Sequence, residues 1–389
     1  MKKQVKKDTN WIYGLKLLAA FCVVIHHYAL YFFPAFIDGN SNLVRTSNAI
    51  ELKFVNMPFN IFSWGGNVCV AIFFIISGFL IYYKSYYNKV DIKESTIKRY
   101  FRLALPMLFM TLIYIFVVLI LSIKKDALLC SEVYGKIGGY CGYKFSIFKA
   151  LYESMIGFFA NGNTEINPVL WTMKGELIGS FVILCYSEIF KKDKNKTLIY
   201  IISILLLHQT VIFPFLLGMI LCNIYLNNKY DNLLKNPIIK IILIILSLYF
   251  CGFTYQTYGT KLYKFLSIKL SDALLFYHTI GSFLLILTII KSNILKKILS
   301  YPIYKKYANL SFSIYLFHWL ILNTFSMTMM NLLLRRLNYK YSFILMFITS
   351  FIVILIISHF FGEIVMKYTK ITTEKIYDRF FFKEQRGRK

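Results

Sequence analysis

Acidic side chains are scarce in this 389-residue sequence, which has 18 Asp and Glu residues against 45 Lys and Arg residues. It also lacks a Walker A phosphate loop, a glycine-rich dinucleotide fingerprint and the paired Cys/His spacing of a metal site. Tandem repeats are not evident, and the longest expected loop, 124–166, is too short to hold an appended soluble domain. These absences argue against the nucleotide-binding and metal-binding classes that such motifs define. Any chemistry is therefore expected in the apolar part of the chain.

Apolar residues make up 58% of the chain and aromatic residues 18%, with a mean hydropathy of +0.58. This composition predicts an all-α, polytopic membrane helix bundle. Apolar windows of suitable length predict spans near 11–33, 66–83, 103–123, 167–190, 238–255, 273–290, 308–332 and 341–366. Two shorter runs, 197–208 and 211–226, complete a set of about ten helices, or form a hairpin that does not cross fully. We expect one domain over 1–389, with the bundle at 11–366 and a basic cytoplasmic tail at 367–389.

The distribution of Lys and Arg predicts the orientation. The predicted cytoplasmic segments hold 29 of these residues and the predicted outer segments hold 13. This asymmetry places both termini in the cytoplasm by the positive-inside rule. The net charge of +27 needs no nucleic-acid partner, because a basic cytoplasmic face contacts anionic lipids and attracts phosphorylated substrates. The first apolar segment lacks a signal-peptide cleavage site, so we expect it to be retained.

The first predicted span carries three ionisable side chains, Lys16, His26 and His27. The eleven steps from Lys16 to His27 return a helix to within about 20° of the same face, about 16 Å further along. Ionisable groups inside a bilayer are costly and by default indicate a functional site. We therefore take His27 as the candidate general base. His26, about 80° around the helix from Lys16, is a secondary candidate.

Glu176 is the predicted partner of His27. Each residue lies in the outer half of its span, Glu176 at about 13 Å and His27 at a similar depth below the outer surface. A carboxylate beside an imidazole fixes the tautomer of the ring and raises its basicity. Lys174 offers another interpretation, a neutralising ion pair with Glu176. A spacing of two residues, however, places these side chains on different sides of one helix.

Small residues and a basic cluster occur around the second and third predicted spans. The Ser77-Gly78 pair predicts either close helix packing or room for a narrow ligand arm. Lys98, Arg99 and Arg102 precede the third predicted span, where basic residues are usually topology signals. Arg99 and Arg102 are nevertheless three residues apart on one helix side. Two guanidinium groups placed in this way suit a phosphate or pyrophosphate.

Two further groups leave alternatives open. His318 lies near the middle of its span, with Tyr315 and two serines close in sequence, which predicts either interhelical hydrogen bonding or a substrate wall. Cys130 and Cys141 share the long outer loop, with ten residues between them. A disulfide between the two is geometrically easy, and two free thiols are the alternative.

Five motifs resemble, in the same order, those of the acyltransferase-3 family of integral-membrane O-acyltransferases. They are G-L-K-L-L-A-A-F-C-V-V-I-H-H (14–27), F-F-I-I-S-G-F (73–79), K-R-Y-F-R-L-A-L-P (98–106), W-T-M-K-G-E (171–176) and S-F-S-I-Y-L-F-H (311–318). The likeness covers nearly the whole chain. The sequence departs from the family in having Lys16 where an arginine is typical. It also lacks the acidic residue that often precedes this motif, with Tyr13 nearby instead.

The resemblance implies transfer of an acyl group, usually acetyl, from cytosolic acyl-coenzyme A to a hydroxyl of an extracytoplasmic glycan or glycolipid. It implies no permanently bound cofactor, and a multi-pass location that is most simply a bacterial cytoplasmic membrane. The residues that match the family motifs are, for catalysis, His27, Glu176 and His26, and, for substrate binding, Lys16, Ser77, Gly78, Arg99, Arg102, Trp171, Tyr315 and His318.

A transporter, flippase or polymerase of lipid-linked glycans is the alternative, because buried ionisable residues and basic loops also serve transport. Such proteins more often show inverted repeats with broken helices at matching positions, and none is clear in this sequence. A structural scaffold would not require Lys16, His27 and Glu176 within the membrane.

Overall fold

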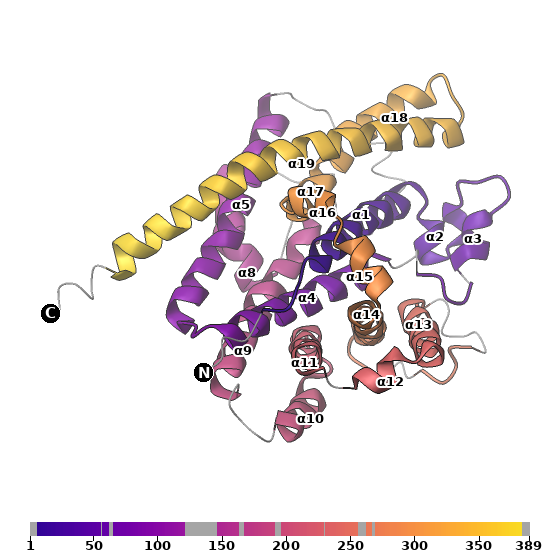
Figure 1. Ribbon diagram of the computed structural model, residues 1–389. Coiled ribbons are helices and arrows are strands. Elements are labelled where there is room, and N and C mark those ends of the chain that lie inside the picture. The colour runs from indigo at the N-terminus through magenta and orange to yellow at the C-terminus, as the bar shows by residue number, and fades with distance from the viewer. Residues whose placement is uncertain are drawn as a thin grey trace. The chain divides into compact units, whose positions relative to one another are not determined.

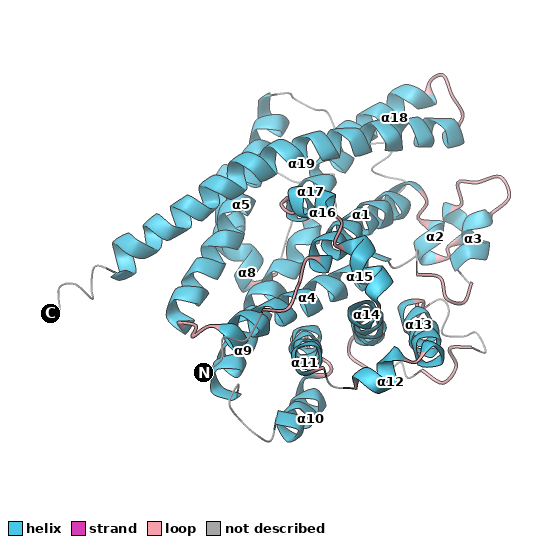
Figure 2. Cartoon of the chain, viewed as in Figure 1, coloured by secondary structure: helices cyan, strands magenta, loops and turns pink. Residues whose placement is uncertain are grey.

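The computed structural model describes residues 6–55, 57–61, 65–120, 146–162, 167–190, 196–228, 230–255, 262–266 and 269–382. Figure 2 shows that helices joined by loops make up these ranges, which contain no strand. The predicted all-α class is therefore confirmed.

The chain divides into two compact units. Unit 1 comprises Met1–Val90 and Ile178–Ala308, and unit 2 comprises Asp91–Leu177 and Asn309–Lys389. Helix α9 (Thr172–Phe190) begins in unit 2 and continues into unit 1. Each unit brings together segments that are far apart in the sequence, as the colours of Figure 1 show.

Unit 1 is built around α4 (Gly65–Tyr87), a 23-residue apolar helix. Three helices pack directly against it: α1 (Trp11–Phe32), α11 (Phe213–Asn227) and α14 (Ala273–Lys291). Helix α13 (Pro237–Cys251) packs on α14. The other helices of the unit are α2 (Ala35–Asp38), α3 (Ile50–Val55), α10 (Lys196–Leu207), α12 (Asp231–Lys235), α15 (Asn293–Leu299) and α16 (Pro302–Lys306). Many apolar side chains that an isolated transmembrane helix would expose to lipid are buried between the helices of unit 1.

Glycines allow α4 and α11 to approach closely. A Cβ atom placed on Gly78 would overlap the carbonyl oxygen of Phe215, and one placed on Gly218 would overlap that of Ile75. Small residues permit such backbone contact between membrane helices. Of the two alternatives predicted for the Ser77-Gly78 pair, close helix packing is the one seen at Gly78.

Unit 2 is built from three helices that pack on one another: α5 (Ile92–Ile120), α17 (Leu310–Ile321) and α19 (Tyr339–Tyr377). Helix α17 continues through a π-helical turn, Leu322–Ser326, into α18 (Met327–Leu334). The other elements are α7 (Ile147–Tyr152), the π-turn Glu153–Gly157, α8 (Phe158–Ala160), the 3-10 turn Pro168–Trp171 and the π-turn Asp378–Phe382.

Two helices of unit 2 extend beyond their predicted spans. Helix α5 starts at Ile92 rather than at 103, so the basic cluster at 98–102 lies inside a helix. Pro106 also lies within this helix. Helix α19 continues through Tyr377, beyond the predicted bundle end at 366. Thr369, Thr373 and Tyr377 are buried, so the first part of the expected tail packs within unit 2.

Among the described residues, seven helical segments are long and apolar enough to cross a membrane. They are Trp11–Phe32, Gly65–Tyr87, Ile92–Val117, Pro168–Phe190, Ala273–Lys291, Leu310–Leu334 and Tyr339–Phe380. Three shorter apolar helices, α10, α11 and α13, occupy the places of the other predicted spans. Helix α13 has 15 residues, a length of about 22 Å, less than the roughly 30 Å of a bilayer core. The count of about ten spans and the cytoplasmic termini stay predictions.

Candidate active site

Helix α1 holds three of the predicted site residues. It is continuous from Trp11 to Phe32, so the regular rotation and rise per residue of an α-helix hold between Lys16 and His27. The two residues therefore share one face, about 16 Å apart along the axis. Lys16 is half-buried within unit 1. One helix thus carries a cation and an imidazole at the predicted separation.

The tautomer of His27 is set by its own helix. Its Nδ1 atom lies 3.0 Å from the carbonyl oxygen of Val23, one turn earlier. A carbonyl oxygen can only accept a hydrogen bond, so Nδ1 carries the hydrogen and Nε2 is the basic nitrogen of the neutral ring. The side chain is half-buried. In this tautomer Nε2 is the nitrogen that can act as a general base.

His26 points into unit 1 toward the first turn of α4. Its side chain is buried, and its ring centroid lies 5.2 Å from that of His27. A Cβ atom on Gly66 would overlap the His26 ring, so the imidazole occupies the space that the missing side chain leaves. The structure places His26 deeper in the protein than His27. Helical phase alone had made it the secondary candidate.

His278 is a buried imidazole of α14 that is absent from the predicted set. Its side chain is fully buried, and Nε2 lies 2.9 Å from the carbonyl oxygen of Phe253. One turn further, Ser282 donates a hydrogen bond of 3.2 Å to the carbonyl oxygen of Val68 on α4. The spacing of His278 and Ser282 by four residues on an apolar helix is the sequence signal that could have identified this face.

Glu176 and Arg99 form an ion pair in unit 2. The carboxylate lies on α9 with its side chain 11% exposed, and the guanidinium lies on α5 with its side chain 33% exposed. The sequence offered Lys174 as an ion-pair partner of Glu176, whereas the structure shows the ion pair with Arg99, a cation far away in the sequence. His27 belongs to unit 1, and its pairing with Glu176 stays a prediction.

The other cations of the basic cluster also contact carboxylates. Lys98 pairs with Glu94 at 2.8 Å and with Glu374 of α19, and Arg102 lies 3.4 Å from Glu374. The Arg102 side chain is 49% exposed. Arg99 and Arg102, predicted on one side of a helix, therefore face carboxylates of different helices. Arg102 is the more accessible of the two.

Tyr315 joins α17 to the turn that precedes α9. Its hydroxyl donates to the carbonyl oxygen of Val169 and lies 2.6 Å from the hydroxyl oxygen of Thr172. Close by, the side-chain amide of Asn167 donates to the carbonyl oxygen of Leu316 at 3.2 Å. These bonds hold the motif that contains Trp171 against the motif that contains Tyr315. Interhelical hydrogen bonding, one of the two alternatives predicted for the 311–318 cluster, is therefore present.

His318 and Trp171 are placed differently in unit 2. The His318 side chain is fully buried, and its Nδ1 donates to the carbonyl oxygen of Ile314 at 3.0 Å, the same local bond that His27 makes. The Trp171 side chain is 40% exposed. The predicted disulfide residues, Cys130 and Cys141, lie outside the described residues.

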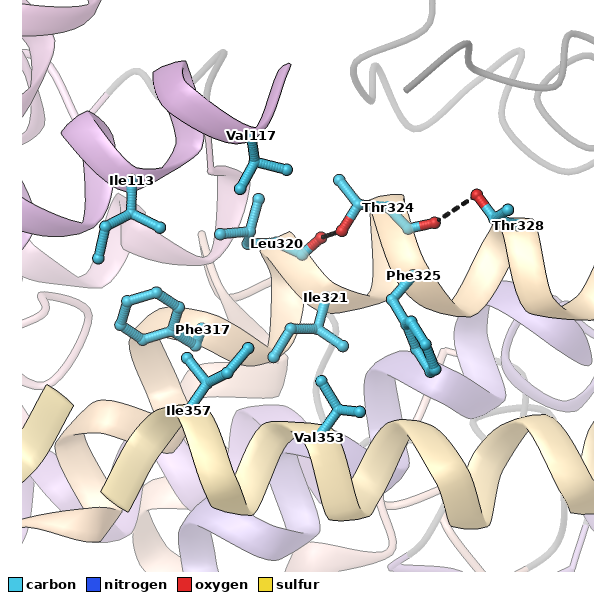
Figure 3. Close-up of a pocket in the computed structure, with 10 residues that line it drawn as sticks. All are labelled: Ile113, Val117, Phe317, Leu320, Ile321, Thr324, Phe325, Thr328, Val353 and Ile357. Carbon is cyan, nitrogen blue, oxygen red and sulfur yellow. Dashed lines mark hydrogen bonds between the residues drawn. The ribbon is translucent and has the colours of Figure 1, made fainter. Parts of the chain in front are cut away.

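An apolar cavity of about 440 Å³ lies in unit 2 between α5, α17, α18 and α19. Figure 3 shows aliphatic and aromatic side chains around it, together with Thr324 and Thr328. The threonine hydroxyls donate to helix carbonyl oxygens, Thr324 to Leu320 at 2.7 Å and Thr328 to Thr324 at 2.9 Å. The lining therefore suits hydrocarbon and offers no acid or base.

Among the described residues, seven helices are long and apolar enough to cross a membrane, and one of them carries the buried His26 and the half-buried His27. These features indicate a multi-pass membrane protein. A family model described as an acyltransferase domain, that of the acyltransferase-3 family, matches residues 9–362. The chain belongs to this family and is a membrane acyltransferase. No curated protein and no solved structure gave a significant match to the chain.

Proposed function

We propose that the protein transfers an acyl group, most simply acetyl, from cytosolic acyl-coenzyme A to a hydroxyl of a cell-surface glycan or glycolipid. The observation that carries this proposal is the arrangement of α1, where Lys16 and the imidazole of His27 share one face of a continuous helix. Their separation of about 16 Å matches the reach of an extended pantetheine arm. The family match supports the reaction class.

The transfer step follows from the chemistry of His27. Nε2 takes the proton of the acceptor hydroxyl while its oxygen attacks the carbonyl carbon of the thioester. A carbon–oxygen bond forms, the carbon–sulfur bond breaks, and the thiolate of coenzyme A leaves. The imidazolium then returns the proton to the thiolate. Ester and free coenzyme A are the products, and His27 is again neutral.

The donor's phosphates are proposed to bind at the cytoplasmic side. Lys16 and Arg102 are the accessible cations of the predicted set, half-buried and 49% exposed respectively. The Arg99 guanidinium already pairs with the Glu176 carboxylate, so Arg99 would bind a phosphate of the donor only by releasing that carboxylate. Ser77 is half-buried and adjoins Gly78, which packs closely against α11. We therefore propose that Ser77 lines the path of the donor's pantetheine arm.

The acceptor is proposed to bind near the exposed Trp171, whose ring could stack against a sugar, with Tyr315 and His318 supporting this wall. The expected surroundings are the lipids of a bacterial cytoplasmic membrane. No nucleic-acid partner is proposed.

The decisive experiment is acyl transfer by the purified protein. Radiolabelled acetyl-coenzyme A is incubated with capsule, O-antigen and teichoic-acid fragments, and label in the glycan is measured. His27→Ala should abolish transfer, whereas His359→Ala, which changes an exposed histidine of α19, should leave it intact. Unchanged transfer in His27→Ala would remove His27 as the base. Movement of glycan across vesicles without any acylation would identify a transporter instead.

A further inference from the structure

The apolar cavity of unit 2 is a recess that opens between three helices. Its floor consists of buried side chains of α17, among them Phe317, Leu320 and Ile321. Its rim includes the exposed side chains of Ile113 on α5 and Ile357 on α19, which Figure 3 shows on two sides of the floor. The recess is therefore accessible from the surface of the unit.

Two contacts with α19 keep this recess from closing. At one end the rings of Phe317 and Phe361 meet, with their centroids 4.6 Å apart. Further along, the hydroxyl of Ser326 donates to that of Ser350 at 2.7 Å. Nine steps of the chain, about 14 Å of helix, separate Phe317 from Ser326. The π-turn Leu322–Ser326 lies in this interval, and such turns are frequent at functional sites.

The recess lies at the level predicted for the middle of the bilayer. Ile113, Leu320 and Val353 line it, and each stands at or next to the midpoint of the span predicted for its helix. All three helical segments are long and apolar enough to cross a membrane. Around the middle of such spans the surroundings are hydrocarbon, without water. The ligand that suits the recess is therefore a hydrocarbon chain.

The size and the chemistry of the lining agree with this ligand. An apolar cavity of about 150 Å³ is enough to bind benzene. The recess, at about 440 Å³, is about three times as large. Its two hydroxyl groups, those of Thr324 and Thr328, donate to carbonyl oxygens of their own helix. These donors are satisfied without a ligand, so an apolar chain can lie beside them at no cost in hydrogen bonds.

A cation lies where the phosphate of a phospholipid would be. Beyond the recess, Thr328, Leu332 and Arg335 follow at spacings of four and three residues on one exposed side of α18. From Leu320 to Arg335 is fifteen steps, about 22 Å along the helix. Half of the roughly 40–45 Å of a bilayer with its headgroups is also about 20–22 Å. A lipid whose chain ends in the recess therefore has its headgroup level with Arg335.

The charge at this end of unit 2 favours an anionic headgroup. Arg336 and Lys340 are exposed and close to Arg335 in the sequence, whereas no Asp or Glu occurs between 310 and 362. A lipid phosphate there meets cations and no carboxylate of α17, α18 or the first part of α19. Guanidinium groups bind phosphate through charge-assisted hydrogen bonds.

The recess is separate from the wall proposed for the acceptor. Tyr315 precedes Phe317 by two residues, which places the two side chains about 160° apart around α17. The Tyr315 hydroxyl faces Val169 and Thr172, in the turn that carries Trp171, whereas Phe317 lines the recess. Helix α17 thus lies between the recess and that wall. The occupant that fits is a lipid of the bilayer and not the acceptor.

We propose that unit 2 binds one anionic phospholipid of the bilayer, with an acyl chain in the recess and its phosphate at Arg335. The chain fills the space between α5, α17 and α19 and so stabilises their packing. No covalent bond forms or breaks. The inference does not rest on the proposed function, because neither the recess nor Arg335 takes part in the transfer step.

Photolabelling of the full-length protein in vesicles tests the recess. The probe is phosphatidylglycerol with a diazirine near the end of one acyl chain, mixed into phosphatidylcholine. After illumination, labelled peptides are mapped. In wild type we expect the label to concentrate at 317–328 and 353–357. Even labelling of all exposed apolar helices would show general contact with the bilayer only. Absence of label from the recess, as when a second copy of the chain covers it, would also overturn the proposal.

Two tryptophan variants provide matched controls for this labelling. Val353→Trp fills the recess, whereas Ile352→Trp adds the same ring at an exposed neighbour that does not line it. We expect label at 317–328 to fall about tenfold in Val353→Trp, because the chain no longer fits, and to stay at the wild-type level in Ile352→Trp. Equal labelling of the two folded variants contradicts the site.

Two arginine variants test the headgroup without changing the recess. Arg335→Ala and Arg336→Ala each remove one exposed cation, about 100° apart around the chain. A bound lipid stabilises the folded protein, so thermal unfolding in detergent reports its binding. We expect the phosphatidylglycerol concentration for half-maximal stabilisation to rise about three- to tenfold in Arg335→Ala and to stay constant in Arg336→Ala. Phosphatidylcholine should stabilise wild type much less. Equal effects of the two variants, or equal stabilisation by both lipids, would overturn the anionic site.

Discussion

Glu176 forms an ion pair with Arg99, although 77 residues separate them in the sequence. The pair lies in unit 2 and links α9 to α5. The sequence predicts different roles for them, Glu176 as the partner of the base and Arg99 as a ligand of the donor's phosphates. In the structure each neutralises the charge of the other. A phosphate that approaches Arg99 has to compete with a carboxylate that is 11% exposed.

This relationship predicts coupling between the two side chains. Arg99→Ala and Glu176→Ala should each lower the free energy of unfolding by about 1.5 to 3 kcal/mol, because each leaves a poorly hydrated charge without its partner. The double variant should lose less than the sum of the two. Unfolding in detergent, followed by heat or denaturant, measures all three changes. Strictly additive losses would show that the pair is not formed.

Arg102 should act on donor binding more than on stability. Its side chain is 49% exposed and its contact with Glu374 is 3.4 Å, so its removal costs little packing. We expect Arg102→Ala to raise the KM for acetyl-coenzyme A about threefold to tenfold at low salt, with a smaller effect at high salt. Lys84→Ala removes an exposed cation from the last turn of α4 and serves as the control. Equal effects of both variants would mean that only general surface charge matters.

The sequence predicts what depends on local periodicity. Lys16 and His27 can be placed on one face because eleven residues of helix have a fixed phase, and α1 is continuous over them. The all-α class follows from composition in the same way. The start of α5 at Ile92 was missed because polar residues precede its apolar part, while the helix itself continues through them.

Contacts between distant segments were not predictable in this way. The ion pair of Arg99 with Glu176 and the hydrogen bond of Ser282 with Val68 arise from how separate helices pack. Hydropathy places each of these residues in or beside a span but gives no information on which residues of other helices it contacts. Gly66 shows the same limit, because only the packed structure reveals that its missing side chain makes room for His26.

Close packing at Gly78 gives a prediction on stability. A Cβ atom there would overlap the carbonyl oxygen of Phe215, and backbone cannot move aside as a flexible side chain can. Gly78→Ala should therefore lower the free energy of unfolding by about 1 to 3 kcal/mol, by separating α4 from α11. Ser77→Ala, at the adjacent half-buried position, is the control and should unfold like wild type. A wild-type unfolding temperature for Gly78→Ala would contradict the packing.

A buried carboxylate of α3, that of Glu51, predicts a dependence of stability on pH. Glu51 accepts hydrogen bonds from the backbone nitrogen atoms of Arg45 at 2.8 Å and Thr46 at 3.1 Å, and from the Thr46 hydroxyl. Burial alone would raise the pKa of Glu51, but these hydrogen bonds outweigh it and hold the pKa below its usual value. The folded form therefore binds the proton less readily than the unfolded chain does.

The stabilisation from Glu51 is present above the unfolded pKa of about 4.3 and is lost as the pH falls through the lower folded value. Glu51→Gln should lower the unfolding temperature at pH 7, and the difference from wild type should shrink as the pH falls below about 4.3. Unfolding of both proteins across this pH range tests it. A difference that stays constant with pH would show that ionisation of Glu51 does not contribute.

Gly65 and Gly66 offer the sharpest test of the histidine arrangement. Both lie in the first turn of α4, so replacement by alanine changes helix propensity equally. A Cβ atom on Gly66 would overlap the His26 ring, whereas one on Gly65 meets no described atom within 4 Å. Gly66→Ala must displace the His26 imidazole, which lies beside His27. We therefore expect Gly66→Ala to lower kcat/KM for acyl transfer at least tenfold while Gly65→Ala keeps wild-type activity. Equal activity of the two variants would show that the position of His26 does not matter for the reaction.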